Sequence, residues 1–151
     1  MKYNVFGAAG AASTTAATAG LINVVNPGSA TMAAAKIYEW SIGPGANSAD
    51  NTYAVRIKRQ TTGGAYTAVT PSPLDKKASA SVTAAGVAQT TAGGTDVEMG
   101  RWGFHMRGGY RWVAIPGGEY VVPLVFSNGI FIEYIFAQGT DVMEPSLWFD
   151  E

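Results

Sequence analysis

The sequence predicts an all-β fold, an antiparallel β-sandwich or jelly roll of about eight strands. In several short segments apolar and polar residues alternate with a period of two, which indicates strands with one buried face. Turn-forming Gly, Pro and Asn residues separate these segments at short intervals, as is typical of sandwiches and barrels. The chain has 151 residues, a length that suits one domain with its own core.

Residues 1–33 are rich in Ala, Thr and Gly, and we expect them to form an extended N-terminal arm. One or two strands are predicted in this arm, near Lys2–Phe6 and Gly20–Val25. Between them no apolar stripe occurs at helical spacing, and Gly, Ser and Thr disfavour a helix. An unstructured tail is the alternative for this segment. Residues 34–151 would then form the β-sandwich domain.

Three segments beyond the arm alternate cleanly: Ile37–Ile42, Thr52–Arg59 and Arg101–Arg107. Their apolar faces would carry Tyr38, Trp40 and Ile42, then Tyr53, Val55 and Ile57, and then Trp102, Phe104 and Met106. Ala84–Thr91 is a weaker strand candidate. The one helical candidate is a single turn near residues 73–78, inside a loop that contains prolines.

Four further strands are predicted in the last third of the chain: Tyr110–Ile115, Glu119–Phe126, Ile130–Ala137 and Ser146–Asp150. Pro116-Gly117-Gly118 is expected to turn the first two into a hairpin. Ser127-Asn128-Gly129 would join the second to the third in the same way, because Asn-Gly favours the tight turns of hairpins.

The segments Glu119–Phe126 and Ile130–Ala137 are apolar on both faces, which a strand at the surface of a sandwich should not be. We expect one face of the first segment to be core, through Tyr120, Val122, Leu124 and Phe126. The other face is either covered inside the chain or buried by a partner. Pro123 lacks an amide donor and suits an edge or bulge position. We favour a subunit interface formed by Val121, Pro123, Val125, Phe131, Ile135 and Trp148.

Catalytic chemistry has few candidates in this sequence. Cys is absent, and the single histidine, His105, shares the expected outward face of its strand with Arg101 and Arg107. Glu119 and Glu133 could approach each other across a hairpin, but two ordinary surface acids are the favoured interpretation. We therefore predict no enzyme activity, no cofactor and no metal site.

Charge and hydropathy limit the partners that the chain could have. Only 14% of residues are charged, against about 25% in a typical soluble domain. The formal net charge is −1 and the basic residues form no large patch, so a nucleic-acid partner is not expected. No segment has the length and apolarity of a membrane span or a signal sequence. We expect a soluble, unsecreted protein whose charge-poor surface suits an assembly.

Four stretches together resemble a known group of proteins. They are KIYEWSIGPGANSADNTYAVRIKRQTTGGAYTAVTPSPLDKKASAS, GYRWVAIPGGEYVVP, SNGIFIEYIFAQGT and the terminal LWFDE. This pattern, over residues 34–151, resembles the capsid cement or decoration proteins of tailed bacteriophages, including those described for cyanophages. The resemblance implies a β-sandwich or jelly-roll virion protein without enzyme activity. It carries no functional motif.

The resemblance also implies partners and a location. Such proteins bind the outer surface of the capsid, commonly as homotrimers that clamp neighbouring subunits of the major capsid protein. The chain would be made in the host cytoplasm and end in the virion. The alternative is a carbohydrate- or receptor-binding sandwich of a phage fibre or spike. Trp40 or Trp112 would then stack on sugars, although the alternation around Trp40 favours the core.

Overall fold

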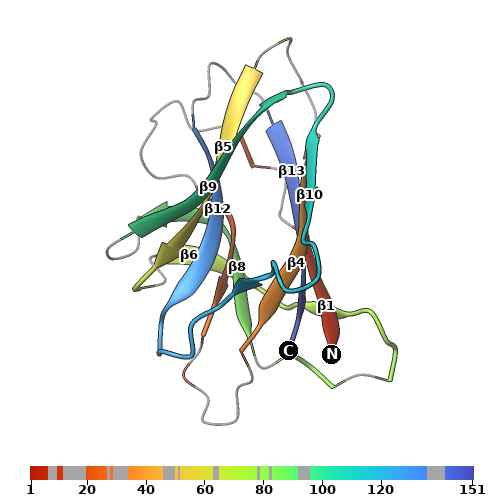
Figure 1. Ribbon diagram of the computed structural model, residues 1–151, viewed down its shortest axis with the longest axis vertical. Coiled ribbons are helices and arrows are strands. Elements are labelled where there is room, and N and C mark those ends of the chain that lie inside the picture. The colour runs from red at the N-terminus through yellow and green to blue at the C-terminus, as the bar shows by residue number, and fades with distance from the viewer. Residues whose placement is uncertain are drawn as a thin grey trace.

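Two antiparallel sheets face one another in the computed structural model of the chain (Figure 1). The structure describes residues 1–6, 10–11, 20–26, 28, 34–45, 50, 52–62, 65–77, 79–81, 83–91, 96–135 and 142–151. These residues include thirteen strands and no helix. The predicted all-β sandwich is confirmed, with more strands than the sequence pattern indicated.

The first sheet, called sheet A, contains seven strands. In spatial order five of them are β10 (Tyr110–Val113), β4 (Lys36–Pro44), β13 (Val142–Asp150), β1 (Lys2–Phe6) and β7 (Ser72–Pro73). Two short strands add to it: β11 (Tyr120–Val121) pairs with β4, and β2 (Gly10–Ala11) pairs with β13. The second sheet, called sheet B, has the order β6 (Ala65–Val69), β8 (Ala84–Thr91), β3 (Gly20–Val25), β12 (Gly129–Ile135), β5 (Thr52–Gln60) and β9 (Asp96–His105).

The two strands predicted in residues 1–33 are present with their predicted bounds, but they are not parts of an arm outside the sandwich. β1 lies between β13 and β7 in sheet A, and β3 lies between β8 and β12 in sheet B. Both are therefore internal strands. Most of the other residues in this segment lie outside the described part of the chain.

Several strands have the predicted bounds or the predicted buried face. β8 has the predicted bounds, and in β5 the side chains of Tyr53, Val55 and Ile57 are buried as expected. The predicted helical turn near residues 73–78 is absent from the described residues. Ser72 and Pro73 instead form a short edge strand beside β1, and the Leu74 N–H donates to the Lys2 carbonyl at 3.0 Å.

Tyr38 does not share the buried face of β4 with Trp40 and Ile42, contrary to the alternation. The register with β13 shifts at this point, because Trp148 pairs with Glu39 whereas Phe149 pairs with Ile37. Tyr38 is thus the extra residue of a β-bulge, and Ile37 takes the core position. The Tyr38 ring is half-buried, with Lys2 Nζ 5.1 Å from its centroid, and burial raises the pKa of its hydroxyl.

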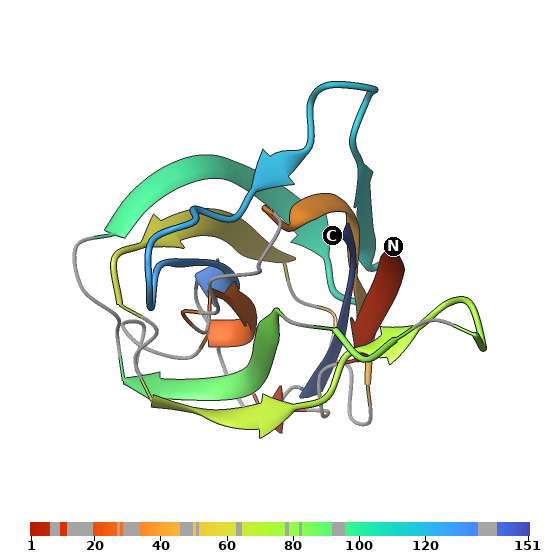
Figure 2. The ribbon, with the colours of Figure 1, turned by 90° about the horizontal axis from the view of Figure 1, so that it is seen from below.

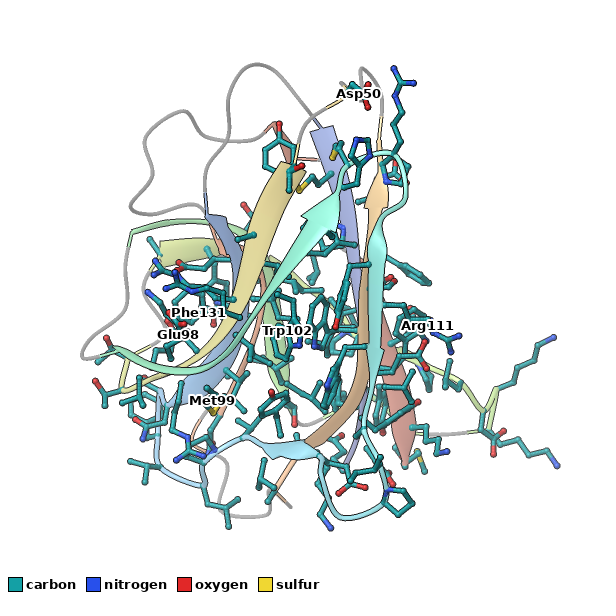
Figure 3. All side chains as sticks on the ribbon, turned by 45° about the horizontal axis from the view of Figure 1, so that its top comes forward. Asp50, Glu98, Met99, Trp102, Arg111 and Phe131 are labelled. Atoms are coloured by element: carbon teal, nitrogen blue, oxygen red, sulfur yellow. The ribbon has the colours of Figure 1, made fainter. Side chains whose placement is uncertain are left out.

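The core lies between the two sheets and is richest in aromatic rings beside Trp40, which is fully buried. The ring of Trp40 lies 5.4 Å from that of Trp102 and 5.3 Å from that of Tyr110, while Trp112 lies 4.8 Å from Tyr120. These rings come from β9 of sheet B and from β10 and β11 of sheet A, and Figure 3 shows Trp102 in the space between β9 and β10. Trp40 cannot stack on an external sugar.

The turn from β9 to β10 allows a direct test of this arrangement. Gly109 and Gly117 both have positive φ, but a Cβ on Gly109 would lie 2.6 Å from the Ile42 carbonyl oxygen, whereas nothing lies within 4 Å of one on Gly117. We expect Gly109→Ala to lower the free energy of unfolding by about 1–3 kcal/mol more than Gly117→Ala, because only the first overlaps backbone. Urea denaturation measures both. Equal losses would mean that the turn does not lie against β4.

Candidate functional site

β10 and β11 are two parts of one interrupted edge strand. Both pair with the same edge of β4: Val113 pairs with Glu39, and Tyr120 pairs with Ile37. Between them the Ala114 N–H donates to the Tyr38 carbonyl at 2.8 Å, which continues the ladder. The predicted hairpin is therefore wrong, because the two strands do not pair with each other.

The loop that interrupts this edge strand projects away from the body of the sandwich (Figure 2). It contains Pro116-Gly117-Gly118, and a tight turn closes where the Gly118 N–H donates to the Ile115 carbonyl at 2.8 Å. The Glu119 carboxylate accepts the Gly117 N–H at 3.2 Å. Hydrogen bonds from the backbone N–H groups of Glu119 and Gly117 lower the pKa of this carboxyl. The loop is thus fixed by its own hydrogen bonds, with Ile115 exposed on it.

The chain crosses from sheet A to sheet B in residues 122–128, so Ser127-Asn128-Gly129 does not form the predicted hairpin turn. The expected core role of Val122 is confirmed, and Tyr120 packs half-buried against the core. Leu124 and Phe126, however, are exposed, contrary to the prediction. The strand ends at Val121, two residues before Pro123. Beyond it the side chains no longer alternate between a core face and an outer face.

Asn26, a buried residue at the end of β3, holds this crossover in place. Its side-chain Nδ2 donates to the Pro123 carbonyl at 3.3 Å. Its backbone N–H donates to the Asn128 carbonyl at 2.9 Å, and its carbonyl accepts the Ser127 N–H at 3.0 Å. Three hydrogen bonds from one residue therefore fix both ends of the crossover.

Gly28 packs against the exposed ring of Phe126. The Gly28 N–H donates to Asn26 Oδ1 at 2.8 Å, and Gly28 has a φ of +83°. A Cβ at this position would lie 2.5 Å from Phe126 Cδ2, so the ring packs directly on the glycine backbone. Phe126 is thus held in an outward position by residues that follow β3.

These segments present an apolar ridge, which we define as Val113, Ile115, Val121, Leu124, Val125 and Phe126. Their exposed fractions run from 42% at Val121 to 77% at Ile115. Of the ten large hydrophobic side chains that are exposed in the described residues, these six lie within one 14-residue segment. A concentration of exposed large apolar side chains in one short segment marks a candidate site of interaction.

The structure brings only part of the predicted interface together. Val121 and Val125 are exposed on the ridge, and Pro123 lies half-buried between them. Their role as contact residues stays a prediction. Trp148 is half-buried on the outer face of sheet A, and the side chain of Ile135 lies outside the described residues.

Phe131 is covered within the chain, so it cannot belong to an exposed interface. It is 3% exposed, and Lys58 Nζ lies 5.4 Å from its ring centroid. Its neighbours Ile130 and Ile132 face the core, so β12 is buried on both sides. For this strand, the second apolar face is covered inside the chain, which was the alternative to a subunit interface.

An ionic cluster accompanies Phe131 on the outer side of sheet B (Figure 3). The Glu133 side chain is 6% exposed, forms an ion pair with Arg56 and lies 3.0 Å from Lys58 Nζ. Arg56 also lies 3.8 Å from Glu98, which Arg101 contacts at 2.7 Å. The hydrogen bonds from Arg101 lower the pKa of the Glu98 carboxyl. The sequence showed the basic residues of β5 but not the acid that lies between them.

The candidate catalytic groups lie apart in the structure. His105 is exposed, with its Nε2 2.8 Å from the exposed carboxylate of Asp50. Glu119 is on the projecting loop of sheet A, whereas Glu133 is in sheet B, so they do not form a pair. Within the described ranges no three His, Cys, Asp or Glu residues gather in a way that could hold a metal ion. Nor do these ranges contain a helix long and apolar enough to cross a membrane.

Comparisons with known proteins do not place the chain in a family: no family model, curated protein or solved structure matches it. The resemblance to capsid cement proteins therefore stays a prediction. The proposals below depend on the residues of this chain and on the contacts between them.

The two carboxylates of the ionic cluster, Glu133 and Glu98, should contribute unequally to the free energy of unfolding. Substituting each of them in turn separates the two contributions. Glu133→Gln should lower the free energy of unfolding by about 3 kcal/mol, because it removes the buried carboxylate from two cations. Glu98→Gln, in the more exposed pair with Arg101, should cost less than about 1 kcal/mol. Urea denaturation at neutral pH compares the two variants. Small and equal losses would contradict a structural role for the buried carboxylate.

Proposed function

We propose that the chain is a structural virion protein, a capsid cement or decoration protein that binds the outer surface of the assembled capsid. It would strengthen the contacts between subunits of the major capsid protein and act without enzyme activity or a cofactor. The resemblance of residues 34–151 to such proteins supports the proposal. The observation that carries it is the apolar ridge, a fixed and exposed apolar surface.

The ridge has the composition of an assembly interface. Between Val113 and Phe126 the only charged residue is Glu119, so few charges would lose water when a partner covers the segment. The cores of protein interfaces are depleted of charge and rich in aromatic and aliphatic side chains in the same way. An enzyme surface or a nucleic-acid interface would require other chemistry here.

The ridge is also prepared for binding before a partner arrives. Asn26 fixes the crossover through three hydrogen bonds, and Gly28 supports the Phe126 ring. A surface that is already ordered loses less conformational entropy on association. A rigid apolar surface therefore favours a tight and specific contact over a transient one.

Capsid stabilisation then follows from mass action. A protein that binds only the assembled shell stabilises it by about 2.7 kcal/mol per site at a hundredfold excess over Kd. If three chains associate, as the resemblance implies, each further contact forms at a high effective concentration. Modest affinity per chain would thus give a large effect on the whole particle.

The double substitution Val121→Lys with Val125→Lys tests the ridge. Both side chains are exposed, so the variant should fold as a monomer, but two buried ammonium groups should abolish binding to capsids. Co-sedimentation with capsids that lack the protein measures this. Leu74→Lys is the matched control, because Leu74 is equally apolar and exposed but lies beside β7, at the opposite edge of sheet A. Wild-type binding by the double variant would overturn the proposed interface.

Particles lacking the protein should release their DNA at a lower temperature than complete particles. Adding purified wild-type protein should restore the release temperature, whereas the double lysine variant should not. A fluorescent DNA dye measures release during heating. If the two kinds of particle resist heat and osmotic shock equally, the chain does not act as a cement protein.

A further inference from the structure

The outer face of sheet A carries a second surface, different in chemistry from the apolar ridge. The register of five strands fixes its residues in rows. One row begins at Val113, the ridge residue on β10, and crosses the sheet through Glu39, Trp148 and Asn4 to Ser72. The neighbouring row contains Arg111, Ser41, Ser146 and Phe6. All of these side chains are exposed or half-buried. They form one continuous surface that faces away from the core.

Two aromatic rings lie at the centre of this face. Trp148 is half-buried in the middle strand, and Phe6 on β1 is 62% exposed. Their ring centroids are 6.4 Å apart and the ring planes are nearly perpendicular, at 81°. An aromatic ring on an otherwise polar sheet offers a platform against which the C–H face of a sugar ring can pack.

Hydrogen-bonding groups lie beside the indole on the side of β4 and β10. Glu39 lies beside Trp148 in the same row and accepts a hydrogen bond from Arg111 Nε at 2.7 Å. Figure 3 shows Arg111 on the opposite side of sheet A from Trp102, directed away from the core. A carboxylate and a guanidinium thus lie beside the ring on this face.

The side-chain charges of this face balance, and the N-terminal ammonium, which forms an ion pair with Asp150, adds one positive charge. Three basic residues and three acidic residues project from it: Lys2, Lys36, Arg111, Glu39, Glu144 and Asp150. A nucleic acid or an anionic membrane would require an excess of positive charge. A protein partner would be expected on a surface with few charges, such as the ridge. Sugar hydroxyls, which both donate and accept hydrogen bonds without net charge, match this mixture.

We propose that the outer face of sheet A binds a neutral carbohydrate, with Trp148 and Phe6 packing against the sugar and Glu39 and Arg111 bonding its hydroxyls. The proposal does not rest on the capsid function, because none of these residues belongs to the ridge. It would add a second binding activity at the centre of this face, which the ridge reaches only at the edge formed by β10, through Val113.

Affinity electrophoresis tests this proposal with polysaccharides of defined composition. The chain is run through native gels that contain galactomannan, β-glucan, xylan or dextran, and at least one of these neutral polymers should retard it. Calorimetry with an oligosaccharide of that polymer then gives the Kd. Trp148→Ala should weaken binding at least about tenfold, whereas Trp148→Phe, which keeps a ring, should weaken it less.

Phe126→Ala is the matched control, because it removes an exposed ring from the ridge and should leave carbohydrate binding unchanged. Phe6→Ala should weaken binding while leaving capsid binding intact, which separates this proposal from the proposed function. If Trp148→Ala fails to fold by circular dichroism, Phe6→Ala and Trp148→Phe carry the test. The proposal is overturned if no polymer retards the wild-type chain, or if Phe126→Ala weakens binding as much as Phe6→Ala does.

Discussion

The edge of β4 that faces β10 and β11 is the constraint on which the exposed surface depends. One strand edge can pair with only one partner at each position, so β10 and β11 must follow one another along it. The residues between them have no place in the sheet and project as a loop. After Val121 the chain leaves β4 and crosses to sheet B, where Asn26 fixes it. The apolar ridge is a consequence of this path.

Much of the fold could be predicted from alternation because many strands have one face in the core and one in water. In β5 and β9 the buried and exposed residues follow the sequence pattern, with Arg101 and His105 outward and Phe104 inward. The segment 119–126 could not be interpreted in this way. After Glu119 its residues are apolar or aromatic, so the pattern does not say which face is buried, and its partner β4 is distant in sequence. Tyr38 was misplaced because a β-bulge adds one residue, which alternation cannot show.

The candidate site was predictable in part, for related reasons. Pro123 was expected at an edge or bulge position of a strand, but the strand ends at Val121. Val121 and Val125, on either side of Pro123 in the sequence, are exposed. Phe131 was misassigned because its cover includes Lys58, a charged residue of a neighbouring strand. Long basic side chains cover apolar surface with their aliphatic stems, and a hydropathy pattern counts them only as polar. The same limit hid the Glu133 cluster, which depends on the pairing of β5 with β12.

The central claim is that the apolar ridge is the surface by which this chain joins an assembly. An electron cryo-microscopy map of the native virion, at a resolution that shows side chains, tests it most directly. The account predicts that Ile115, Leu124 and Phe126 lie against density of a neighbouring polypeptide and are fully covered by it. A map in which these side chains face solvent, while another face of the sandwich meets the capsid, would contradict the claim.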